Sequence, residues 1–411
     1  MNGITIKVET NHGSFDAYLS LPPAGSGPGI LLLQEIFGVN GHMRNVADSY
    51  AEEGYVVIAP DLFWRLQPGV QLGYDDPSVA RARELRSQFD IDQGVRDIGA
   101  ALAALRARPE LRGKAAALGY CLGGLMAYLS AARLDVDAAI SYYGVSLDAH
   151  LDEAAAINCP ILFHFPENDR FAPAPLREKI RAAFAAHDDA EFFVYRGADH
   201  AFNNSMRPNY DRVAAQLARS RTIGLLRRVM GPRYDLNAIW ETHGDYEFAT
   251  RDADATIATM VAEPYVNHIP TLTGGIGRRQ LHRFYKYHFI ATLPADTRIV
   301  SISRTVGPDS VVDELLFCCT HDREIDWLLP GIAPTGKYIE VPTVVIIQFR
   351  GDKIAHEHIY WDMGTALKQI GLLERNDLPI AGIECAHKAR DENSPASNQM
   401  LARWKESEGK P

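Results

Sequence analysis

The sequence has few cysteines, no long apolar run and no excess of positive charge, and each lack excludes a class of protein. Its 411 residues contain only five cysteines, an odd and dispersed number in a chain too large to need disulfides. No stretch approaches the roughly 20 apolar residues that a membrane-spanning helix needs. The net charge of −10 disfavours nucleic acid and anionic lipid as partners. We therefore expect a protein of the reducing cytoplasm that binds neither nucleic acid nor membrane.

We also expect no targeting segment at the N-terminus, because its first residues alternate between polar and apolar instead of showing a basic start and an apolar block. Hydrophobic residues make up 46% of the chain, enough for sizeable buried cores. A chain of this length usually divides into two domains.

The first half of the chain alternates short aliphatic runs, such as ILLL and VVIA, with amphipathic stretches. This alternation is typical of an α/β fold with a parallel sheet that is buried on both faces and flanked by helices. The predicted strands cover 29–36, 55–62, 115–121, 138–144, 160–169 and 191–197. The predicted helices cover 46–54, 91–109, 122–134, 175–187 and 209–230.

The segment GPRYD (231–235) breaks the helical pattern, and the order of elements changes after it. Helices first and strands afterwards indicate an α+β unit with a curved, mostly antiparallel sheet, and Gly351-Asp352 predicts a hairpin turn. The predicted helices cover 236–265 and 275–290, and the predicted strands cover 296–306, 310–320, 338–350 and 353–361. We expect an α/β domain over 1–230, an α+β domain over 236–385 and a polar tail over 386–411.

The segment AAALGYCLGG carries the sharpest chemical signal. It reads as a strand, then Gly119, Cys121 and Gly123 in a G-x-C-x-G motif, then a helix. In α/β-hydrolases this order forces a nucleophile into a strained turn, and the helix N-terminus favours the thiolate. A cysteine between glycines is more often a small buried hydrophobe, but this context favours catalysis. The N–H of Leu122 then becomes an oxyanion donor.

Suitable partners follow Cys121 in the order that α/β-hydrolases use: nucleophile, acid, histidine. Asp169 ends a predicted strand, and His200 lies in a loop after the next one. His200 would accept the thiol proton and later protonate the leaving oxygen, while Asp169 would orient the ring. Asp199 competes for the acid role, but a side chain adjacent to His200 reaches its far nitrogen with difficulty.

Glu35 is a further candidate because it follows a very apolar predicted strand, where an unpaired carboxylate is costly. It is equally well read as a loop cap or as part of a surface salt bridge.

With these residues in view, 5–230 resembles the dienelactone hydrolase (carboxymethylenebutenolidase) family. The resemblance rests on QEIFG, APDL, GYCLGG, SYYG, END followed by FAPAP, and DHAF. It implies that Cys121, His200 and Asp169 form a triad and that Glu35 contacts the resting thiol. It also implies that the N–H of Ile36 joins that of Leu122 in the oxyanion hole.

The chain departs from that family at the arginines that hold the substrate carboxylate. Asn203 and Asn204 stand where one is expected after the histidine. Arg81 or Arg83 would supply the other, out of clear register, and Arg207 is a further candidate. Dienelactone itself is therefore not the expected substrate.

Residues 236–375 resemble the SnoaL-like branch of the nuclear-transport-factor-2-like fold, a cone of helices against a curved sheet. The resemblance rests on EPYVNHIP, GRRQLHRFYKYHF, FRGDKIAHEHIYWD and LKQIGLL. It implies a polyketide cyclase, an isomerase or a ligand-binding or dimerising domain. The candidate pocket residues are His268, His358, Tyr360 and Asp362, although a polar cluster without chemistry is the stronger reading. His356-x-His358 lacks further ligands, so we expect no metal.

The main hypothesis is thus a hydrolase that cleaves a small carboxylic ester or lactone through a Cys-His-Asp triad and an acyl-enzyme, without a cofactor. In the alternative, the C-terminal domain is the functional module, as a cyclase or isomerase using His268 and Asp362, or as a ligand-binding unit that forms a homodimer. A third hypothesis makes Cys121 a redox sensor, since exposed thiols of low pKa oxidise readily.

Overall fold

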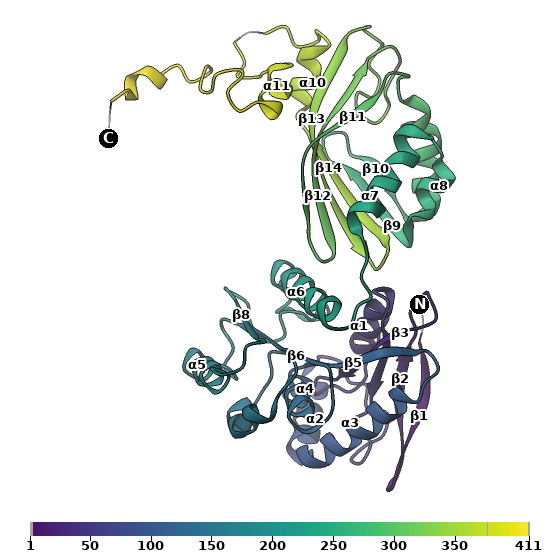
Figure 1. Cartoon of the computed structure of the whole chain (residues 1–411), viewed down its shortest axis with the longest axis vertical. Helices are drawn as coiled ribbons and strands as arrows, with labels where there is room; N and C mark the ends of the chain where they lie inside the picture. The colour runs from purple at the N-terminus through teal and green to yellow at the C-terminus, as the bar shows by residue number, and fades with distance from the viewer. Residues whose placement is uncertain (1–2, 376, 410–411) are drawn as a thin grey trace. The chain divides into compact units, whose positions relative to one another are not determined.

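The computed structural model describes residues 3–375 and 377–409 (Figure 1). The chain divides into two compact units, and the division falls between Arg233 and Tyr234. This point lies inside the GPRYD segment, where the sequence predicts a change in the order of elements. Both predicted fold classes are confirmed: the N-terminal unit is an α/β-hydrolase fold, and the C-terminal unit has a mostly antiparallel sheet covered by helices.

The N-terminal unit is built on an eight-stranded sheet in the order β1-β2-β4-β3-β5-β6-β7-β8. The strands from β4 to β8 along this order run parallel, whereas β1 and β2 form an antiparallel hairpin that the sequence did not reveal. The bounds are β1 Ile4–Thr10, β2 Gly13–Ser20, β3 Gly27–Leu33, β4 Val56–Pro60, β5 Leu111–Tyr120, β6 Ala138–Tyr142, β7 Ile161–Pro166 and β8 Ala190–Tyr195.

Helices cover both faces of this sheet, as Figure 1 shows, which explains why β3, β4, β6 and β7 are buried along their whole length. Helices α1 (Gly41–Glu52) and α6 (Arg212–Met230) pack against one face. The other face carries α2 (Asp76–Gln88), α3 (Ile91–Arg106), α4 (Leu122–Arg133), the 3₁₀ helix η1 (Leu147–Ala156) and α5 (Ala174–Ala183).

The C-terminal unit has a six-stranded sheet in the order β10-β9-β14-β13-β12-β11. All neighbouring pairs are antiparallel except β14 with β9. The predicted hairpin at Gly351-Asp352 is confirmed, because Arg350 of β13 pairs with Lys353 of β14. The bounds are β9 Met260–His268, β10 Thr273–Ile276, β11 Arg298–Val306, β12 Ser310–Thr320, β13 Tyr338–Arg350 and β14 Lys353–Trp361.

The helices of this unit pack mainly on one face of the sheet, called here the inner face, where the core lies. Helix α7 (Leu236–Gly244) continues as a π-helical turn, η2 (Asp245–Ala249), and α9 (Gly277–Phe284) continues as another, η3 (Tyr285–Phe289). The short helices η4 (Ile290–Thr292), α8 (Ala253–Ala258) and α10 (Met363–Gln369) complete this layer.

Two predictions for this unit are wrong in part. The predicted helix over 236–265 ends early, since Met260–His268 forms strand β9, which pairs in parallel with β14. The predicted tail begins later than residue 386, because α11 (Glu384–Arg390) packs on the opposite face of the sheet and buries Ala386 there. Beyond it, the 3₁₀ helix η5 (Trp404–Ser407) has no buried residue.

Within the described parts of the chain, no helix combines the length and the apolar character needed to cross a membrane.

Candidate active site

Cys121 stands in the tight turn between β5 and α4, with a backbone φ of 56° and ψ of −112°. A residue with a side chain adopts a positive φ only at a cost, and such strain gathers at functional sites. The flanking glycines make the turn possible, because a Cβ at Gly119 would overlap the carbonyl of Gly123, and one at Gly123 would overlap the carbonyl of Leu33. The strained elbow predicted from the sequence is therefore present.

Two backbone N–H groups are available beside this turn. Leu122 is the first residue of α4, so its N–H has no partner within the helix. Ile36 lies in the loop after β3, and its N–H donates to no other backbone group in the described residues. The neighbouring Gly123 N–H holds the two loops together through a 2.9 Å hydrogen bond to the carbonyl of Gln34. Both donors proposed for an oxyanion thus lie on linked loops.

Asp169 and His200 form the ion pair that the sequence predicts. Asp169 follows β7, its carboxylate is fully buried, and its Oδ2 lies 2.7 Å from Nδ1 of His200. The second oxygen, Oδ1, accepts a 2.9 Å hydrogen bond from the N–H of Phe171. The His200 ring is held between the rings of Tyr143 and Phe171, with centroid distances of 5.0 and 4.9 Å. His200 pairs here with Asp169, as predicted, and not with Asp199.

The electrostatics of His200 link it to the thiol. Burial by itself lowers the pKa of His200, but the negative charge of Cys121 and hydrogen bonds to Asp169 and Cys121 outweigh it and raise this pKa to about 10. The imidazole is therefore charged at neutral pH when the thiol is ionised. An imidazolium beside a thiol favours the ionised form of the sulfur, which is the nucleophilic form of a cysteine.

Glu35 is 2% exposed, so it forms no surface salt bridge. Its Oε2 accepts a 2.9 Å hydrogen bond from Nδ2 of Asn204, and its Oε1 lies 3.5 Å from the hydroxyl of Tyr143. Burial lowers the pKa of the nearby His42, and the charge of Glu35 opposes that shift. The carboxylate faces the same cavity as Cys121. Asn204 thus holds the carboxylate of Glu35 by a hydrogen bond. The place of Asn204 in the sequence did not suggest this role.

A cavity of about 680 Å³ opens above Cys121 and His200. Four arginines line it, whereas the carboxylates on its wall come from Glu35 and Asp199. The excess of positive charge suits a substrate that carries a negative group. The arginines are Arg83, Arg86, Arg170 and Arg207.

The arginines predicted from the sequence have different fates. Arg83 and Arg207 line the cavity, whereas Arg81 does not and instead bonds to Glu84 and Gln67 on the exposed side of α2. Arg86 was missed, although helical spacing contains the signal, because residues three and four apart share a face. The stripe of α2 that lines the cavity is Val79, Arg83, Arg86 and Ser87.

The four pocket residues predicted for the C-terminal unit do not gather at one place. His268 lines a small cavity of about 50 Å³ on the inner face. His358 lies on the opposite face, directly across from Asn267 and Ile346, and Tyr360 shares that face. Asp362 caps α10 by accepting hydrogen bonds from the N–H of Gly364 and the hydroxyl of Thr365. The β14 residues at the cavity are Glu357 and Ile359.

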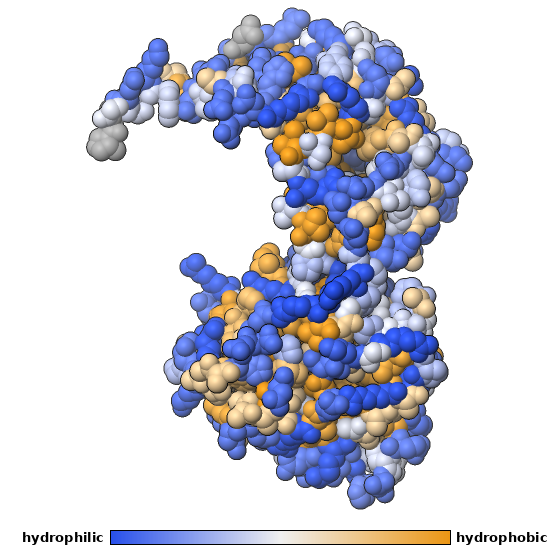
Figure 2. Space-filling model, in the orientation of Figure 1, coloured by the Kyte–Doolittle hydropathy of each residue, from blue (hydrophilic) through white to orange (hydrophobic). Residues whose placement is uncertain are grey.

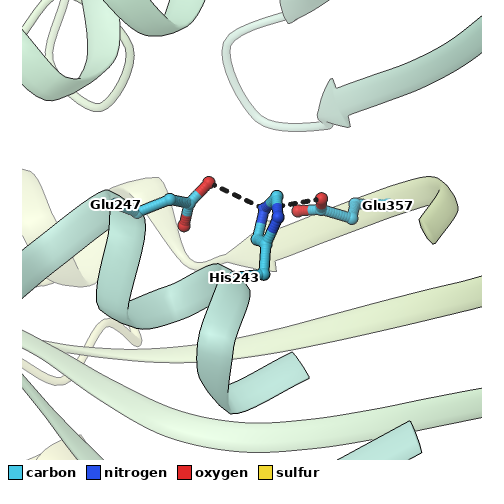
Figure 3. A group of neighbouring side chains, drawn as sticks. All are labelled: His243, Glu247 and Glu357. Carbon is cyan, nitrogen blue, oxygen red and sulfur yellow. Dashed lines mark hydrogen bonds and ion pairs between the residues drawn. The ribbon is translucent and has the colours of Figure 1, made fainter. Parts of the chain in front are cut away.

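A buried cluster beside this cavity escaped the sequence-based prediction. His243 and Glu247 come from the α7–η2 helix, and Glu357 comes from β14; Figure 3 shows the two carboxylates on either side of the imidazole. The spacing of His243 and Glu247 places them one turn apart, which was a visible signal. Glu357 lies far along the chain, and only the fold brings it near.

Comparison with known proteins agrees with this division. Residues 15–230 match the model of the dienelactone hydrolase family, and residues 245–370 match that of SnoaL-like polyketide cyclases. The C-terminal unit is thus SnoaL-like, as the sequence predicts.

Similar proteins are known for the N-terminal unit. A putative carboxymethylenebutenolidase of Azospirillum brasilense is 40% identical over 225 residues, which are 53% of this chain and 95% of that protein. A carboxymethylenebutenolidase of Pseudomonas sp. strain P51 is 38% identical over 219 residues, 53% of this chain and 91% of that protein. The crystal structure of a putative dienelactone hydrolase from Klebsiella pneumoniae, 29% identical, covers 55% of this chain and 98% of that one with a TM-score of 0.49. The chain belongs to the dienelactone hydrolase family.

Proposed function

We propose that the N-terminal unit hydrolyses a small carboxylic ester or lactone through a covalent acyl-enzyme on Cys121, with His200 and Asp169 completing a triad. The family supports the reaction class, since its members named above are lactone hydrolases. The observation that carries the mechanism is the 2.7 Å pair of His200 with buried Asp169, together with a thiol close enough to raise the pKa of His200. No cofactor takes part.

In the acylation step, the Cys121 thiolate attacks the carbonyl carbon of the substrate. The carbonyl oxygen becomes an oxyanion, which the N–H groups of Leu122 and Ile36 stabilise. The C–O bond then breaks, and Nε2 of the His200 imidazolium gives its proton to the leaving oxygen. The products of this step are a thioester on Cys121 and an alcohol, which stays attached to the acyl group when the substrate is a lactone.

In the deacylation step, water attacks the thioester and gives a proton to His200. The tetrahedral intermediate collapses, expels the Cys121 thiolate and releases the acid product, which loses its own proton to solvent. The thiolate and imidazolium are thereby restored. Asp169 keeps the tautomer of His200 fixed and stabilises its charge in both steps.

The preferred substrates carry a carboxylate or another anionic group. Arg83 and Arg86 on α2 and Arg207 in the loop after His200 face the same cavity as the thiol. Arg86 lies close enough to Cys121 for the thiolate charge to oppose the lowering of the Arg86 pKa by burial. We expect these arginines to hold the anionic group of the substrate. The arginines that the family resemblance implies for this role stand at other positions. All five cysteines are free thiols, which fits the reducing compartment proposed here.

Burst kinetics with an activated ester test this proposal. Wild-type protein mixed with excess p-nitrophenyl acetate should release about one equivalent of p-nitrophenolate rapidly and then turn over slowly. Cys121→Ala should abolish the burst and lower the steady rate at least about 1000-fold.

The matched control is Cys159→Ala, since burial raises the pKa of the Cys159 thiol to about 11 and keeps it protonated. This variant should retain the full burst. Turnover by Cys121→Ala at the wild-type rate would overturn the proposal.

The C-terminal unit supports a second function, self-association. Its sheet exposes apolar side chains on the face opposite the core, and Figure 2 shows apolar residues at the surface of this unit where Figure 1 draws β12 and β13. Val312 pairs across the strands with Ile346, and Val344 pairs with Tyr360, so the four share that face. Each is at least 37% exposed. An exposed apolar sheet face of this kind marks a protein interface.

Light scattering on the full chain tests this second function. The wild type should run as a homodimer, and Ile346→Lys should run as a monomer with unchanged far-ultraviolet circular dichroism. A monomeric wild type at micromolar concentration would exclude self-association.

A further inference from the structure

The deepest cluster of titratable groups outside the hydrolase site lies in the C-terminal unit. His243, Glu247 and Glu357 are between 0 and 4% exposed, and one ligand atom from each lies within 4.8 Å of the other two. Nε2 of His243 lies 3.1 Å from Oε1 of Glu247 and 3.3 Å from Oε1 of Glu357 (Figure 3). A single ring nitrogen therefore faces two carboxylates among buried residues.

The other ring nitrogen fixes the tautomer of His243. Nδ1 lies 2.6 Å from the hydroxyl of Thr259, and that hydroxyl donates its own hydrogen to the carbonyl of Thr256, also at 2.6 Å. The hydroxyl can only accept from Nδ1, so Nδ1 carries a hydrogen. In the neutral ring, Nε2 then presents a lone pair to both carboxylates. In metal sites, histidine is commonly held by such a hydrogen bond at Nδ1 while Nε2 binds the ion.

A proton on Nε2 satisfies only part of this cluster. It can serve Glu247, whose oxygen is in hydrogen-bonding geometry, whereas Oε1 of Glu357 is buried without a hydrogen bond. The two carboxylates also lie on either side of one imidazole nitrogen, so they are buried close to each other. The cavity wall includes neither lysine nor arginine among the described residues. Burying two carboxylates together is costly, whereas a divalent cation bound between them would stabilise both.

A second observation points to a ligand at the same place. Tyr285, which is 1% exposed, lines the cavity, and its hydroxyl makes no hydrogen bond of standard geometry. Burial, and after it the charges of Glu357 and Glu247, raise the pKa of Tyr285 well above its ordinary value, so the hydroxyl is close to both carboxylates. Tyr285 and Glu247 both lie in π-helical turns, which occur often at functional sites.

From this geometry we infer that His243, Glu247 and Glu357 bind one divalent transition-metal ion, such as Zn²⁺ or Mn²⁺, with an open coordination position toward the cavity. Ligand atoms about 2.1 Å from a tetrahedral ion lie about 3.4 Å apart, close to the two distances seen here. One imidazole and two carboxylates suit these ions better than Ca²⁺ or Mg²⁺, which prefer oxygen alone. Three protein ligands and one open position are the pattern of a catalytic metal site rather than a structural one.

Metal titration of the full-length protein tests this inference. After treatment with a chelator and removal of the chelator, Zn²⁺ or Mn²⁺ is titrated by calorimetry, and bound metal is counted by elemental analysis. The wild type should bind one ion per chain at this site, and its melting temperature should rise with added metal. Glu357→Gln and His243→Gln should lower the affinity at least about 100-fold and lose that rise.

Two controls separate this site from others. Cys121→Ala removes the one thiol that lies beside a histidine in the hydrolase cavity, and it should leave the binding of the ion unchanged. His282→Gln removes an exposed histidine that pairs with Asp254 on neighbouring helices, and it should also change nothing.

Co²⁺ gives a readout that does not depend on a variant. Wild-type protein loaded with Co²⁺ should show visible absorption bands of a low-coordinate site without the near-ultraviolet band of a thiolate ligand. The inference is overturned if the wild type binds no ion, if binding survives in Glu357→Gln, or if only Cys121→Ala abolishes it.

Discussion

Each unit places a histidine against carboxylate, partly exposed His200 in one and fully buried His243 in the other, and the contrast separates two kinds of chemistry. His200 faces one carboxylate and one thiol at the edge of a cavity of about 680 Å³. His243 faces two carboxylates beside a cavity of about 50 Å³. In both, burial lowers the pKa and the negative neighbours raise it to about 10. Similar electrostatics thus serve different ends.

The two histidines differ in the groups beside them that can exchange a proton. At His200, the thiolate and imidazolium balance each other, and the proton has a substrate oxygen to go to. At His243, both neighbours of Nε2 are carboxylates held among buried residues. The first arrangement suits proton transfer, and the second suits the binding of a cation.

The largest expected effect concerns the carboxylate that orients His200. Asp169→Asn should lower kcat about 1000-fold or more, because an amide stabilises neither the tautomer nor the charged form of the ring. Steady-state hydrolysis of an activated ester measures this. Asp199→Asn should cost far less, since Asp169 occupies the position beside Nδ1. The reverse order would show that Asp199 is the acid.

The next effect concerns the four arginines of the cavity beside Cys121, whereas the small cavity of the C-terminal unit has neither arginine nor lysine among its described lining residues. The double variant Arg83→Ala, Arg86→Ala should raise KM about tenfold or more for esters that carry a carboxylate, and should leave neutral esters almost unaffected. Arg81→Ala on the same helix is the matched control, because Arg81 lies outside the cavity. Equal losses for charged and neutral esters would contradict a role in binding the anionic group.

The smallest effect concerns stability and pH. The pKa of His200 rises from 6.5 to about 10 in the folded chain, so its protonation stabilises the fold fully below pH 6.5 and loses this effect as the pH approaches 10. The melting temperature of the wild type should therefore exceed that of His200→Gln by a few °C near pH 6. The difference should shrink steadily up to pH 10. A difference that is constant with pH would contradict the raised pKa.

Local patterns in the sequence predicted most of the hydrolase site. The glycines around Cys121, the strand before it and the helix after it are adjacent in the chain, so the strained elbow is visible without a structure. The order of Asp169 and His200 follows from the topology of the parallel sheet. The family resemblance contains no signal for Arg86, whereas helical spacing from Arg83 places the two on one face of α2.

The C-terminal unit was harder to predict because its contacts are distant in sequence. Strand β9 pairs with β14 near the end of the domain, and without that partner its apolar residues also fit a helix. Alternation along β14 correctly placed His358 and Glu357 on opposite faces of the sheet. It did not indicate which of the two faces packs against the core. In the structure, Glu357 lines the cavity and His358 does not. The partner of Glu357, His243, comes from a helix at the other end of the domain.

The most direct test of the central claim is to locate the acyl group during the burst. Wild-type protein quenched with acid milliseconds after mixing with p-nitrophenyl acetate should gain the mass of one acetyl group, and peptide mapping should place it on Cys121. The adduct should be absent from Cys121→Ala. Acetylation elsewhere in the chain, or full turnover with no adduct at any time, would contradict the account.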